Sequence, residues 1–126
     1  MTVDRAAAAR WLDGYVEAWR SADPGAIGEL FSADAAYYPE PYTAPLEGRE
    51  AIVAAWVGEQ DPPNSWAARY EPVAVEGDVA VATGITRYFD EGGAERARYH
   101  NVFLLHFDSA GRCSEYREWW MAEDLT

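Results

Sequence analysis

The residues best suited to chemistry lie near the end of the chain, where one acidic side chain stands between two aromatic ones. Glu118 follows Tyr116 and precedes Trp120 at two-residue spacing, so in a β-strand all three share one face. Aromatic neighbours exclude water from a carboxylate and raise its pKa toward the range of a useful general acid or base. Glu118 is therefore the first candidate for proton transfer; the alternative is an exposed glutamate, which is common on protein surfaces.

A β-hairpin must position this carboxylate. Residues 98–121 predict two long strands joined at the small and polar sequence DSAG of residues 108–111. Strand alternation puts His100 and His106 on the face opposite Asn101, which favours a surface or interface role over a nucleophile-base pair. The same alternation gives the other face Tyr99, Asn101, Phe103, Leu105 and Phe107.

Two helices are predicted at the start of the chain. Between residues 4 and 21, apolar side chains recur at three- and four-residue steps, as in a helix with one buried face. This stripe consists of Ala8, Trp11, Leu12, Tyr15 and Trp19. Asp23 and Pro24 suit the N-cap and first turn of a short second helix. Its buried side is predicted to consist of Ile27, Leu30 and Phe31.

A proline-rich loop, residues 39–45, separates a short predicted strand over residues 35–38 from a third helix. Its three prolines forbid regular strand pairing, and we expect the loop to cover an opening. Glu40 in this loop is a second candidate for the pocket carboxylate. The third helix is predicted to begin at Gly48 and to end before Pro62, with a packed face made of Ala51, Ile52, Ala55 and Trp56.

Residues 66–75 and 79–89 are rich in β-branched and aromatic residues and predict a second hairpin. A turn over residues 90–95 leads into the hairpin that holds Glu118. Helices followed by four long strands favour an antiparallel sheet covered on one face, an α+β fold. We expect a single domain over residues 1–126, with a pocket between the sheet and the first helix.

Composition narrows the possible partners. The formal net charge of -12 opposes nucleic acid and anionic lipid, and the N-terminal residues carry acids through what would be the apolar core of a signal peptide. The six Trp and eight Tyr are more aromatic residues than a small core needs, so some of them are expected to line a pocket or another surface. Cys113 is the only cysteine and is expected to be a buried, unreactive thiol, which fits a cytoplasmic protein. We expect neither a metal nor an organic cofactor.

The order of these elements resembles the nuclear transport factor 2-like superfamily, which includes ketosteroid isomerases, limonene epoxide hydrolases, scytalone dehydratases and polyketide cyclases. The resemblance rests on YVEAWRSADPGAIGELFSADAAYY, GREAI and AGRCSEYREWW, in this order and at this spacing. It implies a cone-shaped α+β fold, in which a curved antiparallel sheet carries three N-terminal helices over its concave face.

Two enzymes of this superfamily suggest roles for single residues. YREWW resembles the aromatic-Arg-Asp-aromatic-aromatic phrase of limonene epoxide hydrolases and places Glu118 at the water-activating carboxylate. Tyr37 resembles the water-binding tyrosine of that site. The positions of its partner Arg and Asp fall near Gly84 and Thr86, and its asparagine falls near Pro39. The resemblance therefore implies a Glu118 without an orienting partner.

The phrase YVEAW resembles the first helix of ketosteroid isomerases and places Tyr15 at the oxyanion-hole tyrosine. The alternative is a core tyrosine of the helix stripe. The position of that family's base falls on Pro39, with Glu40 beside it, and its neutral carboxyl donor falls on Phe103. Both resemblances imply that the strand face that carries Glu118 points into one cavity. The residues predicted for the wall of this cavity carry no positive charge. The predicted substrate-binding residues are Trp11, Trp19, Trp56, Tyr99, Asn101, Phe103, Tyr116 and Trp120.

Three hypotheses of function follow from these residues. The first is a small enzyme that uses Glu118, with Tyr15 or Tyr37 as hydrogen-bond donor, for general acid/base chemistry on an apolar oxygenated small molecule. The second is a binding module that holds such a ligand without chemistry. The third is a dimerisation domain with a filled core. A homodimer packed through the outer sheet face is expected in each case, because Trp119 and Met121 would otherwise remain uncovered.

Overall fold

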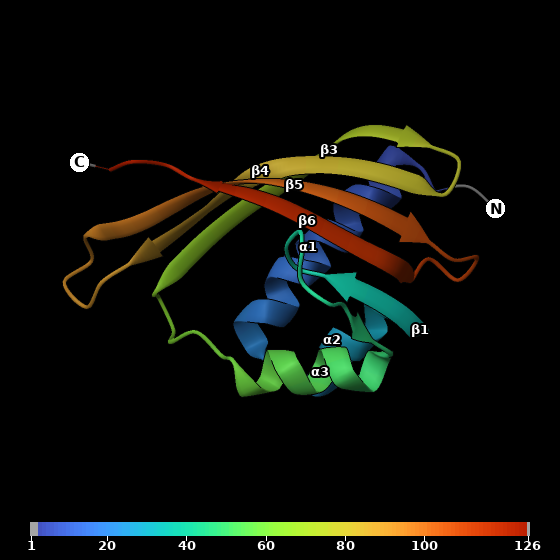
Figure 1. Cartoon of the computed structure of the whole chain (residues 1–126), viewed down its shortest axis with the longest axis horizontal. Helices are drawn as coiled ribbons and strands as arrows, with labels where there is room; N and C mark the ends of the chain where they lie inside the picture. The colour runs from blue at the N-terminus through green and yellow to red at the C-terminus, as the bar shows by residue number, and fades with distance from the viewer. Residues whose placement is uncertain (1–2, 126) are drawn as a thin grey trace.

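A computed structural model of the protein describes residues 3–125 and consists of one curved sheet with helices on one of its faces. Among these residues, the sheet has six strands in the order β2-β1-β6-β5-β4-β3. Figure 1 shows that α1, α2 and α3 lie together on one side, with the strands curving over them. The predicted α+β fold with helices over one face of the sheet is confirmed.

Helix α1 spans Arg5–Ser21 and begins where the sequence predicts. Asp4 is its N-cap, and the carboxylate oxygen Oδ1 accepts a hydrogen bond from the backbone N–H of Ala7 at 2.7 Å. The helix ends at Ala22, whose left-handed backbone conformation closes the last turn. Its buried face, made of Ala8, Trp11, Leu12, Tyr15 and Ala18, packs toward the sheet and contacts β3.

Helix α2 spans Pro24–Glu29 and is shorter than its apolar residues suggest. Leu30 ends the helix and Phe31 opens strand β1, Phe31–Tyr38, so the prediction that both belong to the helix is wrong. The reason is a long-range contact: the backbone N–H of Cys113 donates to the carbonyl of Leu30 at 2.8 Å and draws this segment into the sheet. Both side chains remain buried, as predicted.

The loop after β1 leads to a two-residue strand, β2, at Leu46–Glu47, which pairs with β1 in the antiparallel sense. Pairing therefore resumes directly after the last proline of the loop, where backbone N–H groups are again free to donate. Helix α3 spans Arg49–Gly58 and ends four residues before Pro62, earlier than the prolines alone require. Of its predicted packed face, Ile52 is buried, whereas Ala51, Ala55 and Trp56 remain partly accessible.

The four long strands form the predicted antiparallel meander. They are β3, Trp66–Glu76; β4, Val79–Phe89; β5, Glu95–Phe107; and β6, Cys113–Ala122. Strand β1 pairs with β6 in parallel, so the sheet is mixed rather than wholly antiparallel. Strand β5 begins at Glu95, which the sequence assigned to the preceding turn. Within residues 3–125, no helix is both long and apolar enough to cross a membrane.

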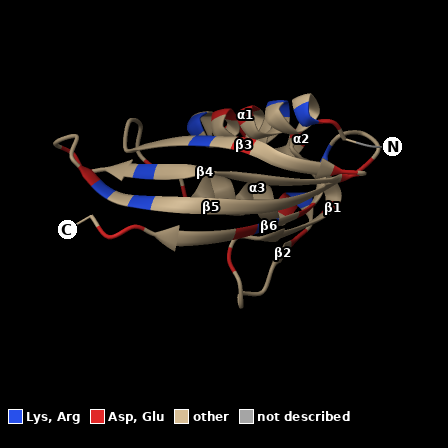
Figure 2. Ribbon diagram, turned by 90° about the horizontal axis from the view of Figure 1, so that it is seen from above, with Lys and Arg blue, Asp and Glu red and all other residues tan. Residues whose placement is uncertain are grey.

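Charged residues on the inner strands pair with one another outside the core. Figure 2 shows basic residues on neighbouring β4 and β5 close to the acidic turn that joins them. There Glu95 accepts hydrogen bonds from Arg87 at 2.8 Å and from Arg98 at 2.6 Å. On β6, Arg117 pairs with Glu115 at 2.9 Å. Arg87 and Arg117 thus pair with acidic neighbours, and these groups stay outside the core.

The inner face of the sheet buries alternate residues, as the sequence predicts for β5. Asn101, Phe103, Leu105 and Phe107 are buried in turn, and Tyr116 of β6 is fully buried between them and α1. Cys113 is a buried free thiol, as predicted, and burial raises its pKa, which disfavours the reactive thiolate.

Gly84 decides how closely β3 and β4 approach on this inner face. It pairs with Tyr70 of β3, and a Cβ atom added at Gly84 would lie 2.1 Å from the carbonyl oxygen of Arg69 and 2.4 Å from Cδ1 of Tyr70. No side chain fits there. The missing side chain lets the Tyr70 ring lie across β4 and bring its hydroxyl to Thr86, two residues along the strand.

Replacing Gly84 with Ala is expected to lower the free energy of unfolding by about 3 kcal/mol or more, because the backbone of β3 must move away. Urea denaturation followed by tryptophan fluorescence measures the change. Gly58→Ala is the matched control: its added Cβ meets no atom within 4 Å. At this helical position the change should be neutral or should stabilise by up to about 1 kcal/mol. Equal effects of the two substitutions would contradict the packing argument.

Candidate active site

A cavity of about 770 Å³ lies between the helices and the inner face of the sheet. All three helices, all six strands and the loop after β1 contribute residues to its wall, as do the residues that follow α3 in the described chain. The volume is in the range of pockets that hold small organic molecules. Aromatic side chains make up much of the wall, namely Tyr15, Trp19, Tyr37, Trp56, Tyr70, Tyr88, Tyr99 and Trp120.

Glu118 points into this cavity with one hydrogen-bond donor on each carboxylate oxygen. The hydroxyl of Tyr116 donates to Oε1 at 2.6 Å, and the side-chain Nδ2 of Asn101 donates to Oε2 at 2.7 Å. Short bonds of this kind to an ionised acceptor are among the strongest in proteins. They fix the orientation of the carboxylate while part of it remains open to the cavity. The expectation that Glu118 lacks an orienting partner is therefore wrong.

A chain of polar side chains continues behind Asn101. The hydroxyl of Thr86 donates to Oδ1 of Asn101 at 2.8 Å, and the hydroxyl of Tyr70 lies within hydrogen-bond distance of Thr86. Because Thr86 uses its single hydrogen on Asn101, Tyr70 must donate to Thr86. These three buried residues come from β5, β4 and β3, so the antiparallel pairing of the strands aligns them.

On the other side of Glu118, the series of hydrogen bonds continues through two tyrosine hydroxyls. The hydroxyls of Tyr15 and Tyr116 lie 3.0 Å apart, and since Tyr116 donates to Glu118, Tyr15 donates to Tyr116. The rings of Tyr15 and Tyr116 are stacked at 5.7 Å, and Tyr37 stacks on Tyr116 at 4.4 Å. Trp56 meets Tyr15 edge to face at 5.0 Å and holds it from the side of α3.

Burial shifts the pKa values of these groups upward. Desolvation raises the pKa of Glu118 above its ordinary value, against the opposing effect of the bonds from Tyr116 and Asn101. Desolvation also raises the pKa values of Tyr15, Tyr37 and Tyr116, and the nearby negative charge of Glu118 adds to each shift. The three tyrosines are therefore neutral hydrogen-bond donors, and Glu118 holds a proton more readily than a surface glutamate does.

Most residues predicted for the pocket line this cavity. Glu118, Tyr15 and Tyr37 do so, as do Trp19, Trp56, Tyr99, Asn101 and Trp120. The other three predicted residues, Trp11, Phe103 and Tyr116, lie in the core behind the cavity wall. Trp11 is held there because its indole N–H donates to the carbonyl of Leu30 at 2.8 Å. Tyr116 reaches the site only through its hydroxyl.

Sequence reasoning missed Asp61 and Arg96 in the cavity wall and Trp66 beside it. Trp19 stacks on Trp66 at 3.6 Å and donates its indole N–H to Asp61 at 2.9 Å. Arg96 also lines the cavity, with its guanidinium 5.2 Å from the centre of the Tyr88 ring, so the expected absence of positive charge from the wall is wrong. The pairing of β4 with β5 is irregular at this point, because Tyr88 faces Ala97 whereas Phe89 faces Glu95. Arg96 is the extra residue, so strict alternation from Tyr99 could not place it in the cavity wall.

Tyr70 and Thr86 were also missed as site residues. A signal for Thr86 existed, because the resemblance to limonene epoxide hydrolases aligns a polar partner of the carboxylate near this position. No comparable signal marks Tyr70, since its role depends on the absent side chain of Gly84. Glu40 does line the cavity, but from the exposed loop and without a described hydrogen bond to the Glu118 network.

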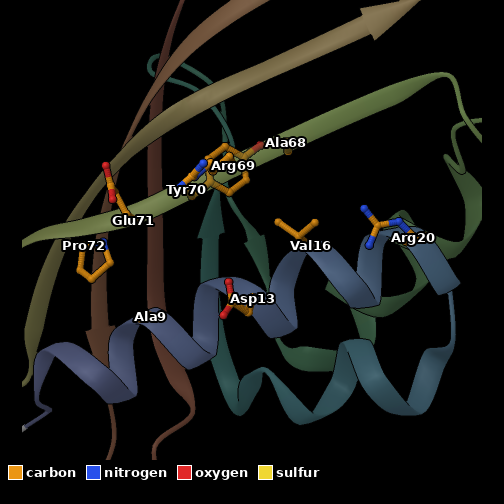
Figure 3. A pocket seen from close by; sticks show the side chains of 9 residues that line it. All are labelled: Ala9, Asp13, Val16, Arg20, Ala68, Arg69, Tyr70, Glu71 and Pro72. Carbon is orange, nitrogen blue, oxygen red and sulfur yellow. The ribbon is translucent and has the colours of Figure 1, made fainter.

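A second hollow of about 410 Å³ lies between α1 and β3 (Figure 3). Its charged side chains are Asp13 and Arg20 from α1, and Arg69 and Glu71 from β3. They are exposed and their charges balance. A solvated, balanced surface of this kind does not tune a titratable group, so the cavity at Glu118 is the candidate site. Among residues 3–125, no group of three or more His, Cys, Asp or Glu side chains is placed to hold a metal ion.

The model of the SnoaL-like domain family matches residues 12–116, most of the chain and nearly all of the elements that build the cavity. The chain belongs to the SnoaL-like domain family. The predicted resemblance to the nuclear transport factor 2-like superfamily is thereby confirmed. No curated protein is similar enough in sequence to be matched to this SnoaL-like chain.

Two solved structures show how widely this fold is shared. An LEH-like epoxide hydrolase of M. tuberculosis has 12% sequence identity and a TM-score of 0.70, over 93% of this chain and 84% of its own. A ketosteroid isomerase-like protein of Erwinia carotovora atroseptica SCRI1043 has 18% identity and a TM-score of 0.67, over 94% of this chain and 97% of its own. At these identities the likeness establishes the fold.

The raised pKa of Glu118 predicts how stability depends on pH. The folded state keeps a proton that the unfolded state loses near the ordinary value of 4.5, so ionisation of Glu118 destabilises the fold as pH rises through this range. In Glu118→Gln this contribution is absent. Urea denaturation from pH 4 to 8 should show the free energy of unfolding of the wild type falling relative to the variant. Parallel curves would contradict the desolvation of Glu118.

Proposed function

We propose that this protein is a small enzyme that performs general acid/base chemistry on an apolar, oxygen-bearing small molecule, with Glu118 as the proton-transfer residue. The observation that carries the proposal is the setting of this carboxylate. It is desolvated, it is oriented by one donor on each oxygen, and it faces an aromatic cavity. A positioned base with a raised pKa is suited to remove a proton near neutral pH.

Tyr15 and Tyr37 are proposed as donors to the oxygen of the substrate. Both line the cavity, and both keep their hydroxyl protons because burial raises their pKa values. When Glu118 removes a proton from a carbon beside a carbonyl group, negative charge develops on the carbonyl oxygen. A neutral hydroxyl that donates to this oxygen stabilises the charge. The two tyrosines would thus act on the oxygen while Glu118 acts on the carbon.

The charges around the cavity favour a neutral or cationic substrate. Four carboxylates, those of Glu40, Glu59, Asp61 and Glu118, line it against the single guanidinium of Arg96 within the described chain. An anionic substrate would meet more repulsion than attraction on entry. The aromatic wall supplies apolar contact and faces on which a flat or cyclic molecule can stack.

The two other hypotheses differ in what the cavity does. A volume of about 770 Å³ argues against a dimerisation domain with a filled core, because the tryptophans leave this space open. A non-catalytic binding module would use the same wall and would hold its ligand without proton transfer. Exchange of hydrogen for deuterium at carbon separates this alternative from the enzyme.

Purified protein in D₂O, supplied with a panel of apolar cyclic ketones, should incorporate deuterium beside the carbonyl carbon of a bound member, as followed by ¹H NMR. Glu118→Gln keeps the shape and removes the base, so the exchange rate should fall by about 100-fold or more. Glu40→Gln is the matched control from the same cavity and should retain the rate. If ketones bind but do not exchange, the protein is a binding module and not an enzyme. If exchange is lost only in Glu40→Gln, the catalytic base is Glu40 of the loop and not Glu118.

We also propose that two copies of this protein pair through the outer face of the sheet. Trp119 and Met121 of β6 are 40% and 60% exposed there, beside the half-buried Val102 and Leu104 of β5. Large apolar groups in one patch mark an interaction surface, and a twofold pairing covers the patches of both copies at once.

The buried free thiol of Cys113 fits a reducing compartment such as the cytoplasm, which we propose as the location.

Sedimentation velocity at micromolar concentration is expected to show a dimer. Trp119→Glu should raise the dissociation constant by about 30-fold or more, because a central aromatic anchor of an interface typically contributes about 2 kcal/mol or more. Tyr42→Glu is the control, since Tyr42 is fully exposed on the loop after β1 and lies away from this face. A wild type that remains monomeric would contradict the proposal.

A further inference from the structure

The cavity wall contains both ends of a hydrogen-bonded link whose middle member is buried behind it. Glu118 and Tyr15 line the cavity, whereas Tyr116, which is 0% exposed, does not. The hydroxyl of Tyr116 lies 2.6 Å from Oε1 of Glu118 and 3.0 Å from the hydroxyl of Tyr15. If Tyr116 changes the group to which it donates, the hydrogen bonding of both Glu118 and Tyr15 changes in the same cavity.

The bonds on the other oxygen of Glu118 have a fixed direction. Asn101 donates to Oε2 through Nδ2 and accepts from Thr86 through Oδ1. Nitrogen and oxygen of an amide cannot exchange roles without turning the whole group over. In a buried site that also holds Thr86 and Tyr70, this turn breaks several bonds at once. Asn101 therefore remains a donor to Oε2 whether or not Glu118 carries a proton.

The bonds on Oε1 are reversible by comparison. A tyrosine hydroxyl both donates and accepts, and its hydrogen changes partner by rotation about the C–O bond. Tyr116 can donate to Glu118 while accepting from Tyr15, or it can accept from a protonated Glu118 while donating to Tyr15. The ring positions are the same in both cases, because the stacked rings of Tyr15, Tyr116 and Tyr37 need not move.

We propose that Tyr116 is a positioning residue that couples proton uptake by Glu118 to hydrogen-bond donation by Tyr15 into the cavity. This inference rests on the proposed function, since it concerns the same proton-transfer residue. It assigns the two oxygens of Glu118 different tasks: Oε2 stays anchored to Asn101, and Oε1 receives the proton.

The coupled step balances without another reactant. Glu118 removes a proton from the carbon beside the substrate carbonyl, the C–H electron pair forms the new carbon–carbon π bond, and the carbonyl π pair moves onto oxygen as an enolate. The proton rests on Oε1, so the hydroxyl hydrogen of Tyr116 turns toward Tyr15. The hydroxyl hydrogen of Tyr15 then turns toward the enolate oxygen. No O–H bond of either tyrosine breaks, and donation arrives as the negative charge develops.

Binding of 4-nitrophenol tests this link without turnover. Its ionised form absorbs visible light and imitates an enolate oxygen, and 4-nitrotoluene is the matched ligand without the hydroxyl. The protein is labelled with ¹³C at glutamate carboxyl groups, and the Glu118 resonance is assigned from Glu118→Gln. We expect the wild type to bind the ionised probe together with protonation of Glu118. Phenolate binding without this protonation would overturn the coupling.

Two variants break the link at different points. Tyr15→Phe should weaken binding of the ionised probe by about tenfold or more, because the donor to its charged oxygen is lost, while 4-nitrotoluene binds as before. In Tyr116→Phe, Tyr15 has no Tyr116 hydroxyl to donate to and is free for the probe, so the rise in the pKa of Glu118 that probe binding causes should be smaller than in the wild type. Tyr116→Phe should also raise the pKa of Glu118 further, since its donor to the ionised form is gone. Tyr15→Phe should leave this pKa nearly unchanged, because Tyr116 still donates.

Tyr38→Phe is the control variant, because Tyr38 follows Tyr37 on β1, is not part of the cavity wall and lies under the guanidinium of Arg117. It should behave as the wild type. If the probe raises the pKa of Glu118 in Tyr116→Phe as much as it does in the wild type, the coupling is wrong. If Tyr116→Phe does not fold, Tyr15→Phe decides alone, since it cuts the same link. If Glu118→Gln retains deuterium exchange, the proposed function is wrong. The binding experiments with 4-nitrophenol would still decide whether Tyr116 couples Glu118 to Tyr15.

Discussion

The site depends on the balance between desolvation of the Glu118 carboxylate and the two donors that hold it. A carboxylate that loses water without new partners takes up a proton or moves to the surface. Here Tyr116 and Asn101 donate at 2.6 and 2.7 Å and offset part of that cost. Tyr116 precedes Glu118 by two residues on β6, so alternation alone brings it to the same face. Asn101 belongs to β5 and requires the correct pairing of two strands.

That pairing leaves little freedom. Glu118 faces Phe103 across β5 and β6, and Asn101 faces Trp120, so the amide reaches the carboxylate along a diagonal between neighbouring pairs. A shift of one residue would turn every inward side chain of the strand outward. The buried Phe103, Leu105 and Phe107 prevent this shift, because each would lose its place in the core. Apolar burial along the strand thereby fixes the geometry of the polar site.

Aromatic packing fixes the other half of the site. Tyr15 comes from α1, Tyr37 from β1 and Tyr116 from β6, and the rings of Tyr15 and Tyr37 each stack on that of Tyr116, with the hydroxyls near Glu118. This group of three tyrosines belongs to the core, and Tyr15 and Tyr37 also line the cavity. Low sequence identity with structures of the same fold is consistent with this division, because the pattern of apolar residues sets the fold while a few polar groups set the chemistry.

The sequence by itself determined the order of the elements and the inward face of the hairpin, because both follow from local periodicity and turn residues. It singled out Glu118 for the same reason, since its aromatic neighbours are two residues away on one strand. The boundary between α2 and β1 could not be predicted from the sequence. A backbone hydrogen bond from Cys113 to Leu30 decides it, and these two residues are far apart in the sequence.

Only the tertiary structure decided which polar groups meet the carboxylate. Asn101, Thr86 and Tyr70 lie on three strands, and nothing in the local pattern of any one strand indicates the other two. Their alignment depends on strand register and on the space left by Gly84 beside Tyr70. Local periodicity specifies which face a side chain occupies, whereas contact between strands is specified by packing that involves the whole core.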